Sequence, residues 1–432
     1  MQENGTMVAK LFERGIDMDS YTQKMNFFGN TDPEQLVAKY GSPLFVYNED
    51  ILRRQMKRVA GLLPNHRFTS NFSIKTNSNL SILKMAFEEG LNADAMSPGE
   101  IYALKKAGFP SERIFYVSNN VSEEEMQYAI DEGVIVSVDS LSQLEMFGRL
   151  NRGGRLSVRI NPGVGAGHHD KVVTAGKKTK FGVAAQDIEK IHDIAAKYDL
   201  HIIGLNQHIG SLFMDYKPFL EACRNFLHYA EEFDELEFLD FGGGFGTPYH
   251  KLADEQEFDI ETFKKELDAL LTEWKKTSGR DVLFKTEPGR YIVAESGVLL
   301  GRVHSVKENY GHKYVGTDIG MNVLIRPELY DSWHDVEIYR DGKPVTGGEK
   351  ETYSVVGNIC ESGDIVAKDR ELPVTHEHDV VCVLDAGAYG FSMSSNYNNR
   401  LRPAEVLIHS DGSDSLIRRR ETLDDLMRCF DV

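Results

Sequence analysis

Residues 236–246 read LEFLDFGGGFG, a short apolar run that ends in three consecutive glycines. Such a run, bounded by turn residues, is typical of a buried β-strand. Seven similar runs occur at 68–75, 91–96, 113–117, 134–139, 156–161, 202–208 and 282–287. Segments with helical spacing lie between most of them, at 80–89, 99–107, 123–132, 185–197 and 219–233. Eight strands alternating with helices within about 220 residues favour an α/β fold of the closed (β/α)8 TIM barrel type over an open, doubly wound sheet.

The pattern of the chain changes after about residue 300. Short β-rich runs separated by Gly and Asp turns follow at 298–303, 314–318, 380–384 and 406–409. An apolar run at 44–47 precedes the barrel, and we expect this N-terminal segment to join the β-rich part. We therefore predict a barrel over residues 48–300 and a second, mostly β domain formed by residues 1–47 with 301–432.

The composition excludes several classes of protein. Hydrophobic residues make up 41% of the 432 residues and charged residues 27%, which is an ordinary globular balance. The net charge of -18 disfavours a nucleic-acid or anionic-membrane partner. No stretch of 18 apolar residues occurs, and residues 1–19 lack the apolar core of a signal peptide, so we expect a cytoplasmic location. The four cysteines are widely spaced, which argues against a disulfide framework or a zinc site.

Reactive residues of such a barrel collect where its strands end. The first predicted strand leads to Lys75, whose amine could form a Schiff base; the alternative is a lysine that extends from a loop edge into solvent. The sixth leads to His208 and Ser211. The imidazole could stack on a flat ring and the hydroxyl could donate to an oxyanion, whereas the alternative is a core histidine bonded to backbone.

Two further strand ends complete a possible cofactor site. Gly243 and Gly244 expose backbone N–H groups that could cradle a phosphate, although a glycine run alone is also typical of a flexible turn. Glu287 could face a ring nitrogen and Arg290 could bind a phosphate or a carboxylate; a surface ion pair is the alternative. An amine, a stacking group, a phosphate cradle and a partner for a ring nitrogen are together the set that a pyridoxal-phosphate site requires.

A metal site is not predicted. His168 and His169 are adjacent, so their side chains point apart on a strand. The group His376, Glu377 and His378 precedes a predicted strand and is typical of a solvated turn.

Ordered motifs carry a family resemblance over about nine tenths of the chain, from about Gly41 onward. They read SIKTN (73–77), SPGE (97–100), RINPG (159–163), KFG (180–182), HIGS (208–211), DFGGGFG (240–246), EPGR (287–290), RPELY (326–330), CESGD (360–364) and GAYG (387–390). With them the chain resembles the alanine-racemase-like, fold-type III pyridoxal-phosphate decarboxylases, and in particular the diaminopimelate decarboxylase family.

The resemblance implies a role for each matching residue in holding pyridoxal 5′-phosphate. Lys75 would bind the cofactor covalently, His208 would stack on its ring and Glu287 would sit at the pyridine nitrogen. The residues implied on the phosphate side are Ser211, Gly243, Gly244, Gly289, Arg290 and Tyr389.

The resemblance also implies a substrate site and a dimer. Arg326 and Tyr330 would bind the distal carboxylate of the substrate, and Glu361 would bind its distal amine. Cys360 would supply the proton that replaces carbon dioxide. Arg290 and Tyr389 would also contact the substrate. The implied reaction is decarboxylation of meso-2,6-diaminopimelate to L-lysine, the last step of lysine biosynthesis, in a homodimer whose sites share the CESGD loop of the second subunit.

Three alternatives remain open from the sequence. The first is a related decarboxylase of arginine, D-ornithine, D-lysine or a carboxylated polyamine, which RPELY and CESGD argue against. The second is a racemase on the same barrel, for which Cys360 is less suited than a catalytic tyrosine. The third is a non-catalytic cofactor-binding relative, although Lys75, Glu287 and Cys360 are all present.

Overall fold

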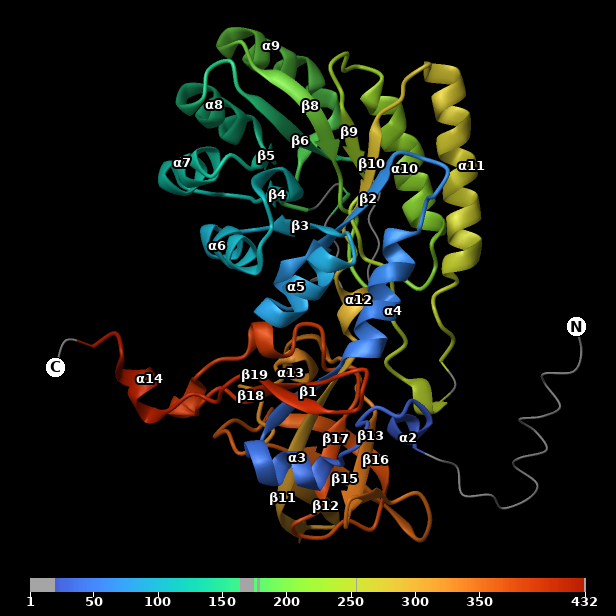
Figure 1. Ribbon diagram of the computed structural model, residues 1–432, viewed down its shortest axis with the longest axis vertical. Coiled ribbons are helices and arrows are strands. Elements are labelled where there is room, and N and C mark those ends of the chain that lie inside the picture. Colours follow the sequence, from blue (N-terminus) through green and yellow to red (C-terminus); the bar gives the residue numbers. More distant parts are fainter. Residues whose placement is uncertain (1–19, 164–174, 177–178, 254, 431–432) are drawn as a thin grey trace, which may run out of the picture. The chain divides into compact units, whose positions relative to one another are not determined.

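The computed structural model describes residues 20–163, 175–176, 179–253 and 255–430 (Figure 1). The chain divides into two compact units. The barrel unit consists of the described residues of Glu49–Gly297 with Asp385–Met393. The β-rich unit consists of the described residues of Met1–Asn48, Val298–Leu384 and Ser394–Val432.

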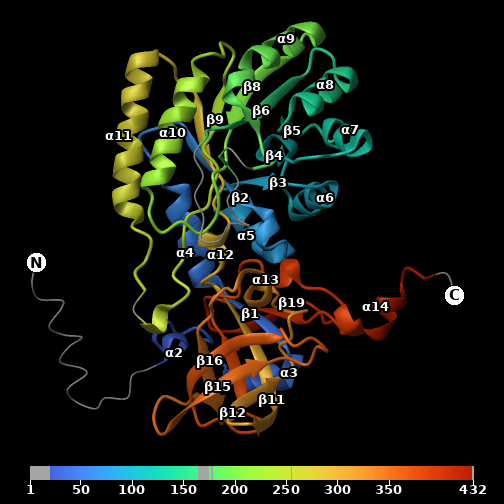
Figure 2. The ribbon, with the colours of Figure 1, turned by 180° about the vertical axis from the view of Figure 1, so that it is seen from behind.

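Eight parallel strands form the barrel, and its closure confirms the predicted fold class. The order β5-β4-β3-β2-β10-β9-β8-β6 closes on itself because β5 also pairs with β6. Helices cover the outside of the strands in both views (Figures 1 and 2). The strands are β2 (Phe68–Ser73), β3 (Asn92–Ala95), β4 (Ile114–Val117), β5 (Ile135–Val138), β6 (Arg155–Asn161), β8 (His201–Asn206), β9 (Phe238–Asp240) and β10 (Leu283–Thr286), and β7 (Val183–Ala184) adds to β6.

The helices of the barrel unit begin and end at residues suited to their positions. Ser97, Ser122 and Ser140 each cap a helix by accepting a hydrogen bond from the third backbone N–H. Gly108 ends α6 in the left-handed conformation. The helices are α4 (Glu49–Ala60), α5 (Leu80–Glu88), α6 (Pro98–Ala107), α7 (Glu123–Asp131), α8 (Leu141–Leu150), α9 (Ile188–Tyr198), α10 (Lys217–Ala230), α11 (Ile260–Ser278) and α12 (Arg290–Val293).

An aromatic cluster supports the loop that follows β9. Phe245 in this loop lies 5.7 Å from Phe219 of α10 and 5.1 Å from Phe263 of α11, measured between ring centroids. Phe213 joins the cluster and pairs with Phe245 in a short parallel bridge. Buried aromatic pairs of this kind stabilise the folded state by more than their buried area alone accounts for. The packing of Phe245 therefore anchors the loop that contains the three preceding glycines.

The β-rich unit is built on a ten-stranded sheet that includes the N-terminal strand. β1 (Leu44–Asn48) pairs in parallel with β18 (Ala404–Ile408), so residues 44–48 are central to this sheet. Its other strands are β11 (Gly297–Asn309), β12 (His312–Thr317), β13 (Val336–Arg340), β14 (Lys343–Pro344), β15 (Lys350–Val356), β16 (Ile365–Pro373), β17 (Val380–Val383) and β19 (Asp414–Arg418). Short helices add to this unit at α2 (Tyr21–Lys24), α3 (Pro33–Tyr40), α13 (Arg326–Tyr330) and α14 (Leu423–Met427).

One segment differs from the predicted domain boundary. Residues Asp385–Met393, which the prediction assigned to the β-rich domain, group with the barrel. The reason is a set of backbone contacts: Ala386 N–H donates to Gly297 O at 2.8 Å, and Tyr389 N–H donates to Thr76 O at 2.9 Å. In the described part of the chain, no helix is long and apolar enough to cross a membrane.

Candidate active site

Lys75 lies in a 3-10 turn, Ile74–Thr76, directly after β2. Its Nζ is 3.9 Å from Oδ2 of Asp94, which is buried at the end of β3. Burial opposes the charge on Lys75, but the carboxylate of Asp94, with smaller contributions from Tyr389 and Glu287, raises the pKa of the amine. The amine is therefore held as a cation at the mouth of the barrel.

Buried carboxyl groups surround this amine. Glu287 follows β10, and burial, with Asp240 and Asp94 adding to it, raises the pKa of its carboxyl well above the ordinary value. Burial also raises the pKa of Asp240, at the end of β9, to about 7. Asp240 accepts hydrogen bonds from Gly242 N–H at 2.9 Å and from Asn71 Nδ2 at 3.0 Å. The site can therefore hold protons near neutral pH that isolated carboxyl groups would release.

His208 follows β8 and is half-buried. Burial lowers the pKa of its imidazole well below the ordinary value, and the nearby charges of Lys75 and Arg159 lower it further. The ring is therefore neutral near pH 7. Because Gly243 N–H donates to Nδ1 at 3.3 Å, Nδ1 is the acceptor and the proton lies on Nε2.

The glycines after β9 and β10 sit where no side chain fits. A Cβ on Gly243 would lie 1.9 Å from Glu287 O, and one on Gly244 would lie 2.2 Å from Gly210 O. A Cβ on Gly289 would lie 2.4 Å from Cγ2 of Thr76. Close packing against other protein atoms therefore requires glycine at Gly243, Gly244 and Gly289.

A cation lies beside these glycines. Arg290 is 6% exposed, and its Nη2 donates to Ser211 Oγ at 3.2 Å while Nη1 donates to Tyr249 Oη at 2.9 Å. The guanidinium also lies over the ring of Tyr389, 4.7 Å from its centroid. The Arg290 guanidinium and the Ser211 hydroxyl, beside a glycine-rich backbone, together suit a phosphate group.

The geometry of the barrel unit fits pyridoxal phosphate. A buried oxygen, Glu287 Oε1, has no hydrogen-bond partner among the described residues. A buried acceptor without a partner costs about 1–3 kcal/mol, and a protonated ring nitrogen would satisfy it. The structure thus brings an amine, an imidazole, this oxygen and a phosphate cradle into one unit.

Arg326 opens helix α13 of the β-rich unit, with Tyr330 at its other end. The side chain is fully buried, at 1% exposure. Its Nη1 donates to His334 Nε2 at 2.6 Å and its Nη2 donates to Ser332 Oγ at 3.4 Å. A buried guanidinium in a fixed orientation is suited to bidentate recognition of a carboxylate.

Cys360 and Glu361 are exposed in a loop of the same unit. Asn398 holds the cysteine from two sides: its Nδ2 donates to Cys360 Sγ at 3.3 Å, and its Oδ1 accepts from Cys360 N–H at 3.1 Å. Tyr397 donates to Glu361 Oε1, and this bond, with a contact to Cys360, raises the pKa of Tyr397 to about 12. The thiol and the carboxylate are therefore presented together.

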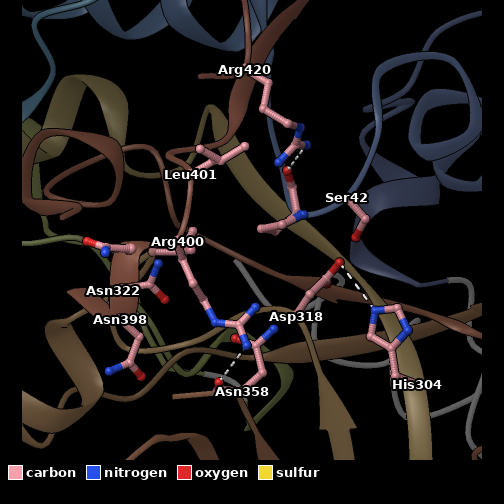
Figure 3. A pocket seen from close by; sticks show the side chains of 12 residues that line it. Ser42, His304, Asp318, Asn322, Asn358, Asn398, Arg400, Leu401 and Arg420 are labelled. Atoms are coloured by element: carbon pink, nitrogen blue, oxygen red, sulfur yellow. Dashed lines mark hydrogen bonds and ion pairs between the residues drawn. The ribbon is translucent and has the colours of Figure 1, made fainter. Parts of the chain in front are cut away.

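A polar cavity of about 570 Å³ adjoins this loop in the β-rich unit (Figure 3). Asn398 is part of its wall, and Arg400 donates to Asn358 O at 2.9 Å. On the other side, His304 lies 3.4 Å from Asp318. The cavity gives space for polar groups next to Asn398, the residue that holds Cys360.

The predicted residues fall into two sets. Those of the barrel unit are Lys75, His208, Ser211, Gly243, Gly244, Glu287, Gly289, Arg290 and Tyr389; those of the β-rich unit are Arg326, Tyr330, Cys360 and Glu361. Sequence reasoning missed the polar residues Asp94, Arg159, Asp240, His334, Tyr397 and Asn398. A polar residue inside or at the end of an apolar run was the available signal for the first three.

The described residues contain no group of three His, Cys, Asp or Glu side chains that could hold a metal ion. His168 and His169 lie outside the described residues. At the other candidate, His376 N–H donates to Asp379 Oδ2 at 2.7 Å, as in a turn.

Comparison with known proteins gives a consistent set of relatives. Residues 49–294 match the family model described as "Pyridoxal-dependent decarboxylase, pyridoxal binding domain". The chain is 40% identical to the diaminopimelate decarboxylase of Methanothermobacter thermautotrophicus, over 93% of this chain and 94% of that protein. It is 35% identical to the diaminopimelate decarboxylase of Archaeoglobus fulgidus, over 91% and 94%.

Solved structures agree with these relatives. The diaminopimelate decarboxylase from Helicobacter pylori complexed with L-lysine has a TM-score of 0.83 and 31% identity, covering 91% of this chain and 98% of that chain. A lysine/ornithine decarboxylase from Vibrio vulnificus complexed with cadaverine has a TM-score of 0.75 and 23% identity, covering 88% and 95%, and shares the fold alone.

Proposed function

Because the chain belongs to the diaminopimelate decarboxylase family, we propose that it converts meso-2,6-diaminopimelate to L-lysine and carbon dioxide, the last step of lysine biosynthesis. One observation supports the proposal most strongly. The barrel unit contains both the amine of Lys75 and a buried oxygen of Glu287 that has no hydrogen-bond partner among the described residues. An amine and a proton-holding carboxyl are what a decarboxylation with pyridoxal phosphate needs from the protein.

The cofactor of this family is pyridoxal 5′-phosphate, which supplies a carbonyl that captures the substrate amine and a ring that accepts electrons when the carboxylate leaves. Lys75 would bind its carbonyl, and His208 would lie against its ring. The phosphate side would be held by Ser211, Gly243, Gly244, Gly289, Arg290 and Tyr389.

The protonation states expected of the site residues support this assignment. Burial raises the pKa of the Glu287 carboxyl, so this group holds a proton that it would share with the ring nitrogen. His208 would contribute a neutral ring, since its pKa is lowered. Cys360 would deliver the proton that takes the place of the carboxylate.

Specificity would come from the distal end of the substrate. Arg326 and Tyr330 would bind the carboxylate that remains, and Glu361 would bind the distal amine. Lysine lacks that carboxylate and would form no ion pair with the buried guanidinium of Arg326. We expect the kcat/KM for lysine to be lower by about 10^4-fold, as at sites built around a polar pair.

The proposal includes a cytoplasmic homodimer in which the Cys360–Glu361 loop completes the site of the partner subunit. Mixing inactive Lys75→Ala and Cys360→Ala proteins, then letting subunits exchange, tests this arrangement. Half of the random dimers would be hybrids with one intact site, so about a quarter of the unsubstituted activity would return. No recovery despite verified exchange would place both residues in a site made by a single subunit.

Release of carbon dioxide from meso-diaminopimelate by protein loaded with pyridoxal phosphate tests the reaction itself. L-lysine, D-lysine, D-ornithine, arginine and a carboxylated polyamine serve as competing substrates, and Lys75→Ala serves as the inactive control. Turnover of diaminopimelate alone supports the proposal. Faster turnover of another substrate would replace it with the related decarboxylase, and a protein that binds cofactor without turnover would be a non-catalytic relative.

A further inference from the structure

The segment Asp385–Met393 contains Tyr389, which contacts Arg290 on the proposed phosphate side of the barrel site. The ring of Tyr389 lies under the Arg290 guanidinium, and its backbone has a φ of 57°. A residue other than glycine rarely adopts this left-handed conformation, so the surroundings must hold it. What fixes the segment therefore decides where the Tyr389 ring lies.

The turn that carries Lys75 holds one part of this segment. Tyr389 N–H and Ser392 Oγ both donate to Thr76 O, at 2.9 and 3.1 Å. Asn77 Nδ2 donates to Gly387 O at 3.1 Å. A Cβ on Gly387 would lie 1.8 Å from Val293 O, so the backbone is pressed against α12 as well. These contacts fix the position of the segment relative to the turn that carries Lys75.

An ion pair holds the start of the segment. Lys251 Nζ lies 2.7 Å from Asp385 Oδ1 and 3.6 Å from Glu295 Oε1, and the three side chains are 11%, 1% and 14% exposed. Glu295 also accepts from Arg54 and Gln55 of α4, each at 3.0 Å. Burial opposes the charge of Lys251, but Asp385 and then Glu295 raise the pKa of its amine, so the pair is charged. Removing one partner leaves the other as an uncompensated buried charge.

We propose that Lys251 is a positioning residue for cofactor binding: by pairing with Asp385 it fixes Asp385–Met393 so that Tyr389 supports Arg290 at the phosphate. This inference rests on the proposed cofactor site, not on the substrate. It predicts that loss of the Lys251–Asp385 pair weakens binding of the cofactor's phosphate and has little effect on binding of its ring.

Two ligands distinguish binding of the phosphate from binding of the ring: pyridoxal 5′-phosphate and pyridoxal, which lacks the phosphate. Binding of each to the cofactor-free protein is titrated by absorbance, without substrate. For Lys251→Met we expect the Kd of pyridoxal phosphate to rise about tenfold or more, and that of pyridoxal to change less than about twofold. Asp385→Asn should do the same, and the double variant should bind no more weakly than either single variant.

Arg54→Met is the matched control, because it removes a half-exposed ion pair to the same Glu295. We expect it to leave both affinities unchanged, and Lys251→Arg to restore most of the loss. If Lys251→Met does not fold, Asp385→Asn and Lys251→Arg carry the test. Equal weakening of both ligands, or no change in either, would overturn the inference. A wrong substrate would leave these titrations unaffected.

Discussion

Nη1 of Arg326 lies 2.6 Å from Nε2 of His334, and the other ring nitrogen, Nδ1, lies 2.8 Å from the carbonyl oxygen of Leu384. A carbonyl oxygen only accepts, so Nδ1 carries the proton and Nε2 accepts from the guanidinium. His334 is fully buried, at 0% exposure. A neutral imidazole in one tautomer therefore orients the arginine proposed to select the substrate.

His334→Phe should weaken this selection. The change keeps the ring but removes the acceptor, so a buried guanidinium N–H loses its partner, at a cost of about 1–3 kcal/mol. We expect the kcat/KM for diaminopimelate to fall about tenfold or more, mainly through KM. Steady-state kinetics measure it, with Ser332→Ala as the control, because that bond to Arg326 is longer at 3.4 Å. Unchanged KM in His334→Phe would argue against the positioning role.

Glu287→Gln should lower kcat. Glutamine keeps the shape of the side chain but cannot exchange a proton with the ring nitrogen, so the electron-accepting state would be less populated. We expect kcat to fall by about 10^2-fold or more, with a small change in KM for the substrate. Kinetics at saturating cofactor give the answer. A variant with near-normal kcat would show that the proton at the ring does not depend on Glu287.

Gly243→Ala should destabilise the barrel unit. Its Cβ would lie 1.9 Å from Glu287 O, so the backbone of two strand ends must move apart. We expect the free energy of unfolding to fall by about 1–3 kcal/mol, as for an overpacked site. Gly99→Ala is the matched control, since its nearest neighbour would be an ordinary 3.8 Å away. Equal urea midpoints for the two variants would contradict the close approach.

The pH dependence of stability tests the environment of His208. Burial, followed by the charges of Lys75 and Arg159, lowers the pKa of this imidazole well below 6.5. As the pH falls through about 6.5 the unfolded chain takes up a proton and the folded chain does not, so the free energy of unfolding decreases.

His208→Gln should remove this contribution, because glutamine does not titrate. We expect the free energy of unfolding of the unsubstituted cofactor-free protein, relative to the variant, to fall by up to about 1.4 kcal/mol per pH unit below about pH 6.5. Urea titrations at about pH 7, 6 and 5 measure the difference. A difference that stays constant with pH would mean that His208 is not held neutral.

Much of the barrel could be predicted because its strands are short apolar runs with ionisable residues at their ends. Lys75 and Glu287 stand out for this reason, and the structure places both at strand ends. Asp94 and Asp240 also lie within or near the end of such runs, but periodicity alone does not reveal that their carboxyl groups are buried around Lys75. Their importance follows from barrel closure, which brings distant strands together.

The remaining features depend on contacts between loops. Cys360 meets Asn398 across 38 residues of sequence, and no local pattern links them. The return of Asp385–Met393 to the barrel was missed because the apolar run at 380–384 was assigned to the β-rich domain together with all the residues that follow it. Contacts in the folded chain reveal it, among them the hydrogen bond from Tyr389 to Thr76 and the close packing of Gly387.

The reaction run in deuterium oxide tests the central claim most directly, with the product analysed by mass spectrometry. If the protein decarboxylates meso-diaminopimelate, the product is L-lysine with one deuterium on the carbon that lost its carboxylate, in equal amount to the carbon dioxide released. Diaminopimelate that gains deuterium without loss of carbon dioxide would instead identify a racemase on this barrel, and would contradict the account.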